Sequence, residues 1–114
     1  MPVGSLEGTI DVSTTDDGVT FTYTVHNDGS EPVRMEFPNA GMADVAVFDE
    51  NGSEIWRYSD GRMYAQVITS DEIEPDGHRQ YEMTWEDPEA GEFIAAAELR
   101  ATTETAAVRT EFTV

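Results

Sequence analysis

The alternation of apolar and polar side chains restricts the fold of this chain more than any other feature. It is clearest at residues 19–25, where Val19, Phe21, Tyr23 and Val25 alternate with threonines. A period of two is typical of a strand with one buried face. Comparable segments are residues 6–14, 33–37, 43–48, 54–58, 63–69, 80–85, 93–99 and 106–114. Since no useful window has a helical period, the chain is predicted to be all-β.

Turn signals separate these segments. Asn51-Gly52 is the strongest of them, because this dipeptide favours the positive φ angles of a two-residue hairpin. About nine short strands at regular spacing are typical of a sandwich or barrel. We predict a single domain over residues 1–114, an immunoglobulin-like antiparallel β-sandwich, with Trp85 in its core and Trp56 packed against it.

The charge excludes several classes of partner. Twenty-four acidic residues oppose six basic ones, all arginine, for a net charge of −18. A polyanion of this kind is a poor ligand for nucleic acid or for an anionic membrane. Its self-repulsion destabilises the compact state at low salt but is screened at molar salt, where the Debye length is about 3 Å. The composition resembles that of proteins from extreme halophiles.

The N-terminal residues 1–7 lack the basic and apolar regions of an export signal, and no apolar run approaches bilayer length. We therefore expect a cytoplasmic protein. The chain has no cysteine, so a disulfide, a thiolate nucleophile and a cysteine-ligated zinc are all excluded.

No catalytic or cofactor site is expected. His26 and His78 are predicted to face solvent, and there is no G-x-S-x-G motif to supply a nucleophilic serine. Asp49, Asn51 and Ser53 approach the spacing of a calcium loop, but Glu54 stands where that loop requires glycine. A hairpin turn explains the same residues, so no metal is predicted there.

Several ordered segments resemble the BsuPI-type intracellular proteinase inhibitor family. They are TVHNDGSEPV (24–33), VFDENGSEIWRYS (47–59), IEPDG (73–77), YEMTW (81–85) and AGEFIA (90–95). The resemblance covers about residues 20–99 and departs from the family in its acid content and in the alanines near residue 95. It implies an immunoglobulin-like sandwich, no enzymatic activity, and inhibition of an intracellular subtilisin-type serine protease.

Such a protease binds an extended peptide in its cleft, so an inhibitor needs an exposed loop held rigid by its flanking strands. Two loops meet this description. The first is Tyr58, Ser59, Asp60, Gly61, Arg62, Met63 and Tyr64, and the second is Pro38, Asn39, Ala40, Gly41 and Met42. The first is preferred, because Arg62, Met63 and Tyr64 are suitable side-chain anchors.

The alternative function is a non-inhibitory, immunoglobulin-like interaction domain of a halophile, since sandwiches are reused for unrelated binding tasks. Titration against a subtilisin-type protease distinguishes the two. We expect a monomer in either case.

Overall fold

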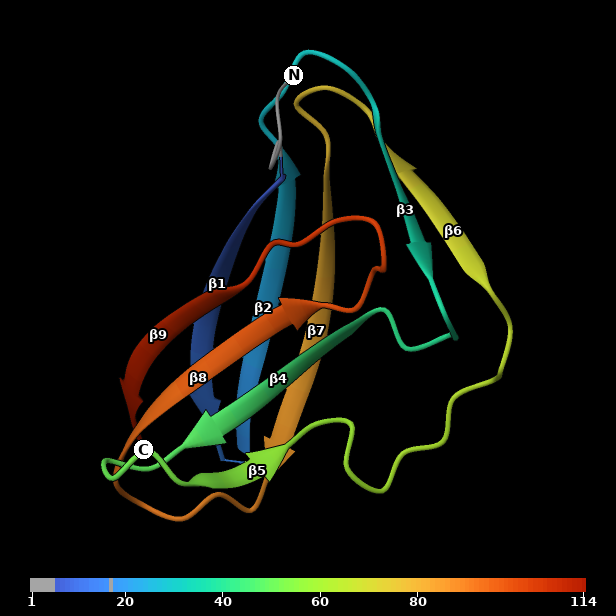
Figure 1. Cartoon of the computed structure of the whole chain (residues 1–114). Coiled ribbons are helices and arrows are strands. Elements are labelled where there is room, and N and C mark those ends of the chain that lie inside the picture. Colours follow the sequence, from blue (N-terminus) through green and yellow to red (C-terminus); the bar gives the residue numbers. More distant parts are fainter. Residues whose placement is uncertain (1–5, 17) are drawn as a thin grey trace.

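The computed structural model describes residues 6–16 and 18–114, and all of its regular structure is β-strand (Figure 1). The strands are β1 (Leu6–Thr15), β2 (Gly18–Asn27), β3 (Val33–Phe37), β4 (Ala43–Phe48), β5 (Glu54–Arg57), β6 (Thr69–Ile73), β7 (His78–Glu86), β8 (Glu92–Leu99) and β9 (Val108–Thr113). The predicted all-β class is therefore confirmed. Most of the N-terminal residues on which the cytoplasmic prediction depends lie outside the described ranges. Within those ranges no helix could cross a bilayer.

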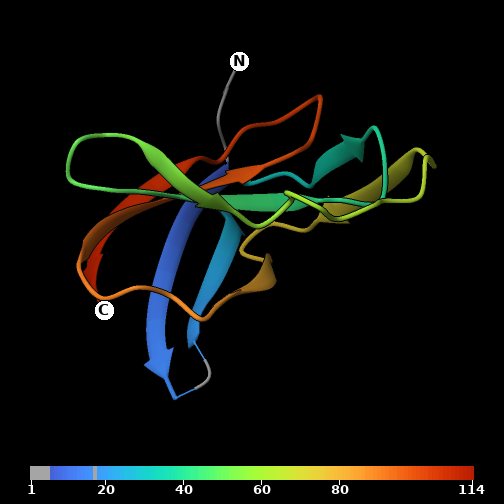
Figure 2. The ribbon, with the colours of Figure 1, turned by 90° about the horizontal axis from the view of Figure 1, so that it is seen from below.

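The strands form two facing sheets and a ribbon, all antiparallel. One sheet has the order β1-β2-β7, the other β5-β4-β8-β9, and β3 pairs with β6 alone. Figure 2 shows the two layers from below, with β1 and β2 (blue) in one and β4 (green) in the other. The chain leaves the first sheet after β2, returns to it at β7 and crosses again to the second sheet at β8, as in the Greek-key connections of immunoglobulin-like folds. The predicted sandwich is confirmed.

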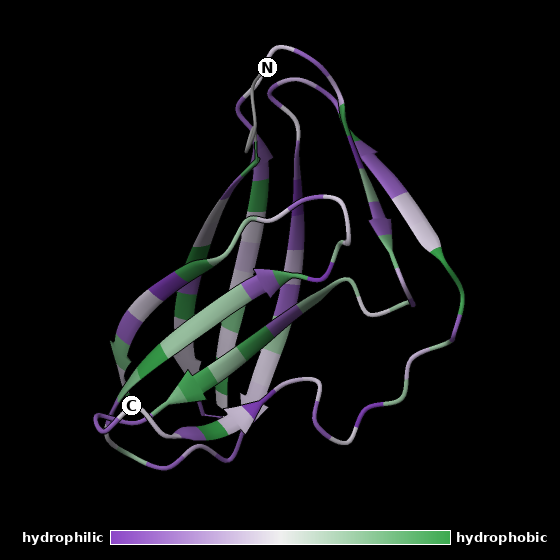
Figure 3. Ribbon diagram, viewed as in Figure 1, coloured by the Kyte–Doolittle hydropathy of each residue, from purple (hydrophilic) through white to green (hydrophobic). Residues whose placement is uncertain are grey.

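The core lies between the two sheets, as the alternation predicts. Val19, Phe21, Tyr23 and Val25 of β2 are all fully buried, while the threonines between them face outward. Each large apolar side chain contributes roughly 1.5–3 kcal/mol by this burial. The opposite sheet supplies smaller side chains, namely Val45, Val47, Ala95 and Ala97. Figure 3 shows the resulting apolar colouring along β4 and β8.

The two tryptophans lie side by side at one end of this core. Trp85 is buried, and the half-buried Trp56 stacks on it with ring centroids 5.8 Å apart. Trp56 also stacks on Phe21 at 6.1 Å. Both predictions of packing are confirmed, so neither tryptophan is a free binding platform.

A hairpin forms at Asn51-Gly52, but its loop is longer than the predicted two residues, since β4 ends at Phe48 and β5 begins at Glu54. Of the two residues only Gly52 has a positive φ. Gly52 has a φ of 84°, and the Asp49 carboxylate accepts hydrogen bonds from the amides of Asn51 and Ser53, each at 2.9 Å. Oδ1 of Asp49 therefore serves to close the turn.

One predicted strand is wrong. Residues 63–68 have no regular structure, and the strand in this part of the chain is β6, which continues to Ile73. β3 determines this position, since Val33 pairs with Ile73 and Phe37 with Thr69. The apolar residues 63–68 lack strict alternation and have no strand beside them. The more polar segment that follows can still form a strand. Pairing with β3 requires only the backbone of that segment and one buried apolar side chain, which Ile73 supplies.

Candidate functional site

A buried carboxylate organises the turn that follows β5. Asp44 lies on β4 and is only 2% exposed. Its Oδ2 accepts hydrogen bonds from the Ser59 hydroxyl at 2.7 Å and from Arg57 Nη1 at 3.0 Å. Its Oδ1 accepts hydrogen bonds from the backbone amides of Val45 at 3.0 Å and Ser59 at 3.1 Å. Four donors thus satisfy a charge that would otherwise be costly to bury.

Arg57 neutralises this carboxylate and connects it to the sheet surface. Its Nη2 lies 2.7 Å from Glu54, and its Nη1 lies 3.6 Å from Glu98. Hydrogen bonds to Glu54 and then to Asp44 raise the pKa of Arg57 above its ordinary value. Arg57 therefore stays charged and holds β5 against β4.

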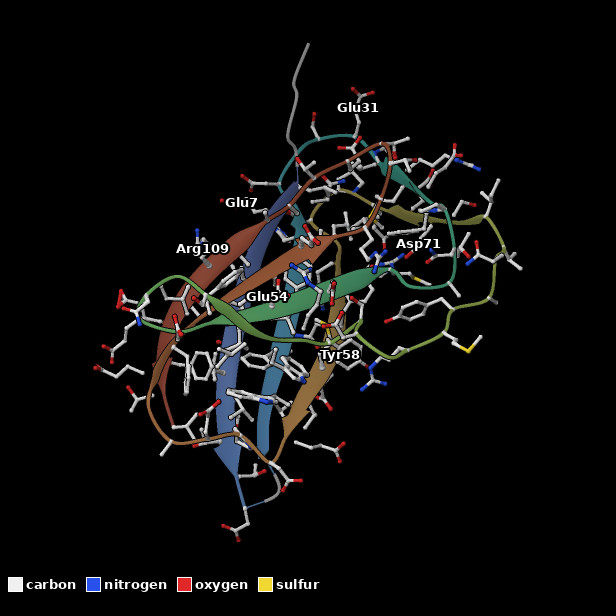
Figure 4. The ribbon with its side chains drawn as sticks, turned by 60° about the horizontal axis from the view of Figure 1, so that its bottom comes forward. Glu7, Glu31, Glu54, Tyr58, Asp71 and Arg109 are labelled. Carbon is white, nitrogen blue, oxygen red and sulfur yellow. The ribbon has the colours of Figure 1, made fainter. Side chains whose placement is uncertain are left out.

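Residues 58–62 form a compact double turn on this base. The Tyr58 amide bonds to the carbonyl of Val45 at 2.9 Å, and the Arg62 amide bonds to the carbonyl of Ser59 at 3.1 Å. The Arg62 guanidinium folds back, with Nε 2.8 Å from the Tyr58 carbonyl and Cζ 3.8 Å from the centre of its ring. Tyr58, labelled in Figure 4, is half-buried between Arg62 and Trp56. Among the predicted contact residues, Tyr58 and Arg62 are thus engaged with each other.

The chain beyond this turn is the most exposed apolar part of the described residues. We call residues 63–68 the exposed segment. Met63 is 98% exposed, Val67 60% and Ile68 76%. Figure 1 shows this part of the chain passing outside the body of the sandwich between β5 and β6. Sequence reasoning included Met63 but missed Val67 and Ile68, because it placed them in a strand.

The second candidate loop lies directly against the first. The Ala40 amide donates to the Ala65 carbonyl at 3.1 Å, and a Cβ at the buried Gly41 would lie 3.0 Å from the ring of Tyr64. The Asn39 side-chain oxygen accepts a hydrogen bond from the Gly41 amide at 2.8 Å, and this bond stabilises the turn. Beyond that turn, the Met42 carbonyl accepts a hydrogen bond from the amide of Arg100, the residue that follows β8, at 2.8 Å. The structure therefore brings together two loops that the sequence shows separately.

Tyr64 makes the side-chain contact between the two loops. Its ring is half-buried, with the Arg100 guanidinium 6.0 Å from the ring centre. Burial raises the pKa of Tyr64 above its ordinary value. Its hydroxyl is enclosed and has no hydrogen-bond partner among the described residues. Tyr64 therefore holds the segment by packing rather than by a polar contact.

Solved structures with a similar strand arrangement include two β-glucuronidases of Bacteroides uniformis. They are 10% identical, with TM-scores of 0.48 and 0.43, and the chain spans 96% of its own length but 13% of theirs. A PapD-like domain of human CEP192 is 20% identical, with a TM-score of 0.42, over 99% of this chain and 85% of that one. No curated protein sequence matches the chain.

The family comparison is specific. The model of the intracellular proteinase inhibitor family, BsuPI, matches residues 6–104. That range includes both candidate loops, the Asp44 carboxylate and every strand except β9. The chain therefore belongs to the BsuPI family of intracellular proteinase inhibitors.

Proposed function

We propose that this chain inhibits a subtilisin-type serine protease in the cytoplasm and acts as a monomer that presents the exposed segment to the protease cleft. The family match over residues 6–104 is the observation that carries the proposal. The geometry supports the choice of segment, because Met63, Val67 and Ile68 are exposed and residues 63–68 lie outside every sheet. An extended peptide can add to the edge of a cleft through its free backbone groups.

The segment is held at both ends, which limits the entropy lost on binding. Upstream, Ser59 is bound to Asp44 through its amide and hydroxyl. Downstream, Thr69 begins β6 and pairs with Phe37. In the middle, Ala65 is bonded to Ala40 of the second loop. Residues 58–62 and 38–42 therefore act as supports, and the contact itself is assigned to residues 63–68.

The side chains of the segment suit short-range recognition. Met63, Val67 and Ile68 place apolar surface in water, where burial in a protease subsite would be favourable. Long-range attraction would contribute little at molar salt, because charges farther apart than the Debye length of about 3 Å are screened from each other. Affinity would then depend on shape and apolar contact.

Titration against a subtilisin-type protease in molar KCl tests the proposal. We expect stoichiometric inhibition by the unmodified chain. Replacing Met63, Val67 and Ile68 together by alanine should weaken inhibition at least about tenfold, since several buried anchors are removed. Ile55→Ala is the matched control, because Ile55 is also exposed, at 37%, but lies on β5.

The outcomes separate the alternatives. Inhibition that survives the triple substitution would show that another surface makes the contact. Absence of inhibition, or simple digestion of the chain, would support the non-inhibitory interaction domain. Arg62→Ala should weaken inhibition less than the triple substitution does. The Arg62 side chain folds back onto Tyr58, so it is not free to contact the protease.

A further inference from the structure

Both histidines of the chain lie in one cross-strand row. His26 on β2 pairs with His78 on β7, and Glu7 on β1 pairs with His26 from the other side. All three occupy outward positions, since their neighbours Leu6 and Val25 point into the core. Directly opposed side chains on neighbouring strands have Cβ atoms about 4.5–5.5 Å apart. The row therefore places two imidazoles and a carboxylate on one surface.

Two further carboxylates approach this row from the adjoining turns. Ligand atoms of Glu7, His26 and Asp28 all lie within 4.8 Å of one another. On the other side, Asp76 Oδ1 lies 3.8 Å from His26 Nε2. Figure 4 labels Glu7, near the start of β1. His26 is thus surrounded by oxygen ligands that come from three separate parts of the chain.

The negative charge of this cluster is not neutralised by arginine. Among the described residues no ion pair joins Glu7 or Asp28 to a guanidinium. Arg79, next to His78, directs its Nε to Asp71 at 2.8 Å, on the inner side of the strand. Carboxylates that converge on an imidazole without a basic partner favour a cation between them.

The donor set indicates which cation. Imidazole nitrogen with carboxylate oxygen is a common ligand combination for Zn²⁺, whereas Ca²⁺ and Mg²⁺ prefer oxygen alone. We propose that Glu7, His26 and Asp28 bind a zinc ion at this end of the three-stranded sheet. His78 lies on the other side of His26, on β7, outside this ligand group. Asp76 is then an outer acceptor that orients the His26 ring.

The site is independent of the proposed inhibitory contact. Asn27, next to His26, is buried and donates through Nδ2 to the carbonyl of Ile73, at the end of β6. The exposed segment precedes the other end of β6, at Thr69. Zinc would connect β1, β2 and the turn after β2, and would stabilise the sandwich without covering residues 63–68.

Zinc titration of the tag-free chain in molar KCl tests this site. High salt screens diffuse attraction to the acidic surface and leaves direct coordination. Competition with a chromophoric chelator should give one zinc per chain, and saturation should raise the melting temperature. His26→Gln and Asp28→Asn should each weaken binding at least about tenfold, while Glu82→Gln, outward on the same sheet, should leave it unchanged.

Three results would overturn the assignment. One is an unchanged zinc affinity in either the His26→Gln or the Asp28→Asn variant. Another is a stoichiometry well above one that falls equally with Glu82→Gln, which would indicate diffuse binding. The third is preference for Ca²⁺ or Mg²⁺ over Zn²⁺. His26 is half-buried on the outer face of the sheet and Asp28 is exposed, so the variants should fold, and circular dichroism verifies this.

Discussion

The ring of Tyr64 lies against Gly41 so closely that a Cβ at position 41 would meet three ring carbons at 3.0 to 3.1 Å. These two residues belong to different loops, separated by β4, β5 and the turn after β5. Their contact determines where the exposed segment leaves the body of the protein. It also explains why glycine is suited to position 41, where even a methyl group would displace an aromatic ring.

Gly41→Val is therefore expected to push Tyr64 outward and loosen the segment. Overpacking of this kind typically costs about 1–3 kcal/mol, and inhibition should weaken with it. Hydrogen exchange at the Ala40 amide, which bonds to Ala65, would report the loosening directly. Ala40→Val is the matched control, because Ala40 is exposed. Equal exchange in the two variants would contradict the packing role of Gly41.

Asp44 should matter more to stability than any other carboxylate described. Asp44→Ala leaves the Ser59 hydroxyl and the amides of Ser59 and Val45 without their acceptor, while Arg57 keeps its contact with Glu54. Each buried donor left unpaired costs about 1–3 kcal/mol. Ser59→Ala removes one hydroxyl donor and should cost about 1–2 kcal/mol. Denaturant unfolding in molar KCl measures both. Asp49→Ala, at an exposed hairpin, is the comparison, and an Asp44 variant no weaker than it would disprove the role.

Two tyrosine-to-phenylalanine substitutions should differ. The Tyr23 hydroxyl donates to the buried Ala106 carbonyl, so Tyr23→Phe leaves that acceptor unpaired, at a cost of about 1–2 kcal/mol. The Tyr64 hydroxyl is enclosed and has no partner among the described residues, so Tyr64→Phe should be neutral or stabilising. Thermal melts compare them. A Tyr64→Phe chain less stable than Tyr23→Phe would refute the difference.

The pair of Asp71 and Arg79 should contribute to acid sensitivity. Hydrogen bonding to Arg79 lowers the pKa of Asp71 below its usual value of about 3.9. The stabilisation is therefore complete above that value and is lost as the pH falls through the lowered pKa. Unfolding of the unmodified chain and of Asp71→Asn should differ at neutral pH and converge below about pH 4. A difference that is constant with pH would contradict this.

Salt should stabilise the fold. The net charge is −18, and among the described residues ion pairs involve only Arg57, Arg79 and Arg100 of the six arginines. Most carboxylates thus repel one another without compensation. Melting followed by circular dichroism should shift upward from dilute buffer to multi-molar KCl. Melting that does not depend on salt would show that the acidic composition is not an adaptation to it.

The strands and turns were largely predictable, because their information is local. Residues 19–25 alternate regularly, and Gly52 takes the positive φ that a glycine in a turn favours. Residues 63–68 were misassigned because propensity cannot show which segment will find a partner. The polar segment β6 forms a strand because its backbone pairs with the edge of β3. That pairing joins distant parts of the chain, so local propensity does not reveal it.

The supports of the site were less predictable than its position. Tyr58 to Tyr64 could be recognised as a loop, yet Asp44 looked like one residue of a predicted strand. An acid inside the run Ala43–Phe48 was the available signal, but its partners Arg57 and Ser59 lie 13 and 15 residues away. Only the β4–β5 register brings them together. The row of His26 and His78 depends on register in the same way.

The pairing of strands has a consequence for a chain that is cut. A break within residues 63–68 would leave β1 to β5 on one piece and β6 to β9 on the other. Those pieces interlock, since β2 pairs with β7, β3 with β6 and β4 with β8. Hydrolysis would thus release no fragment and would keep the two new ends near each other. A protease that cleaved a peptide bond in the exposed segment would therefore still be bound to the cleaved chain. Resynthesis of that peptide bond would then compete with dissociation of the complex.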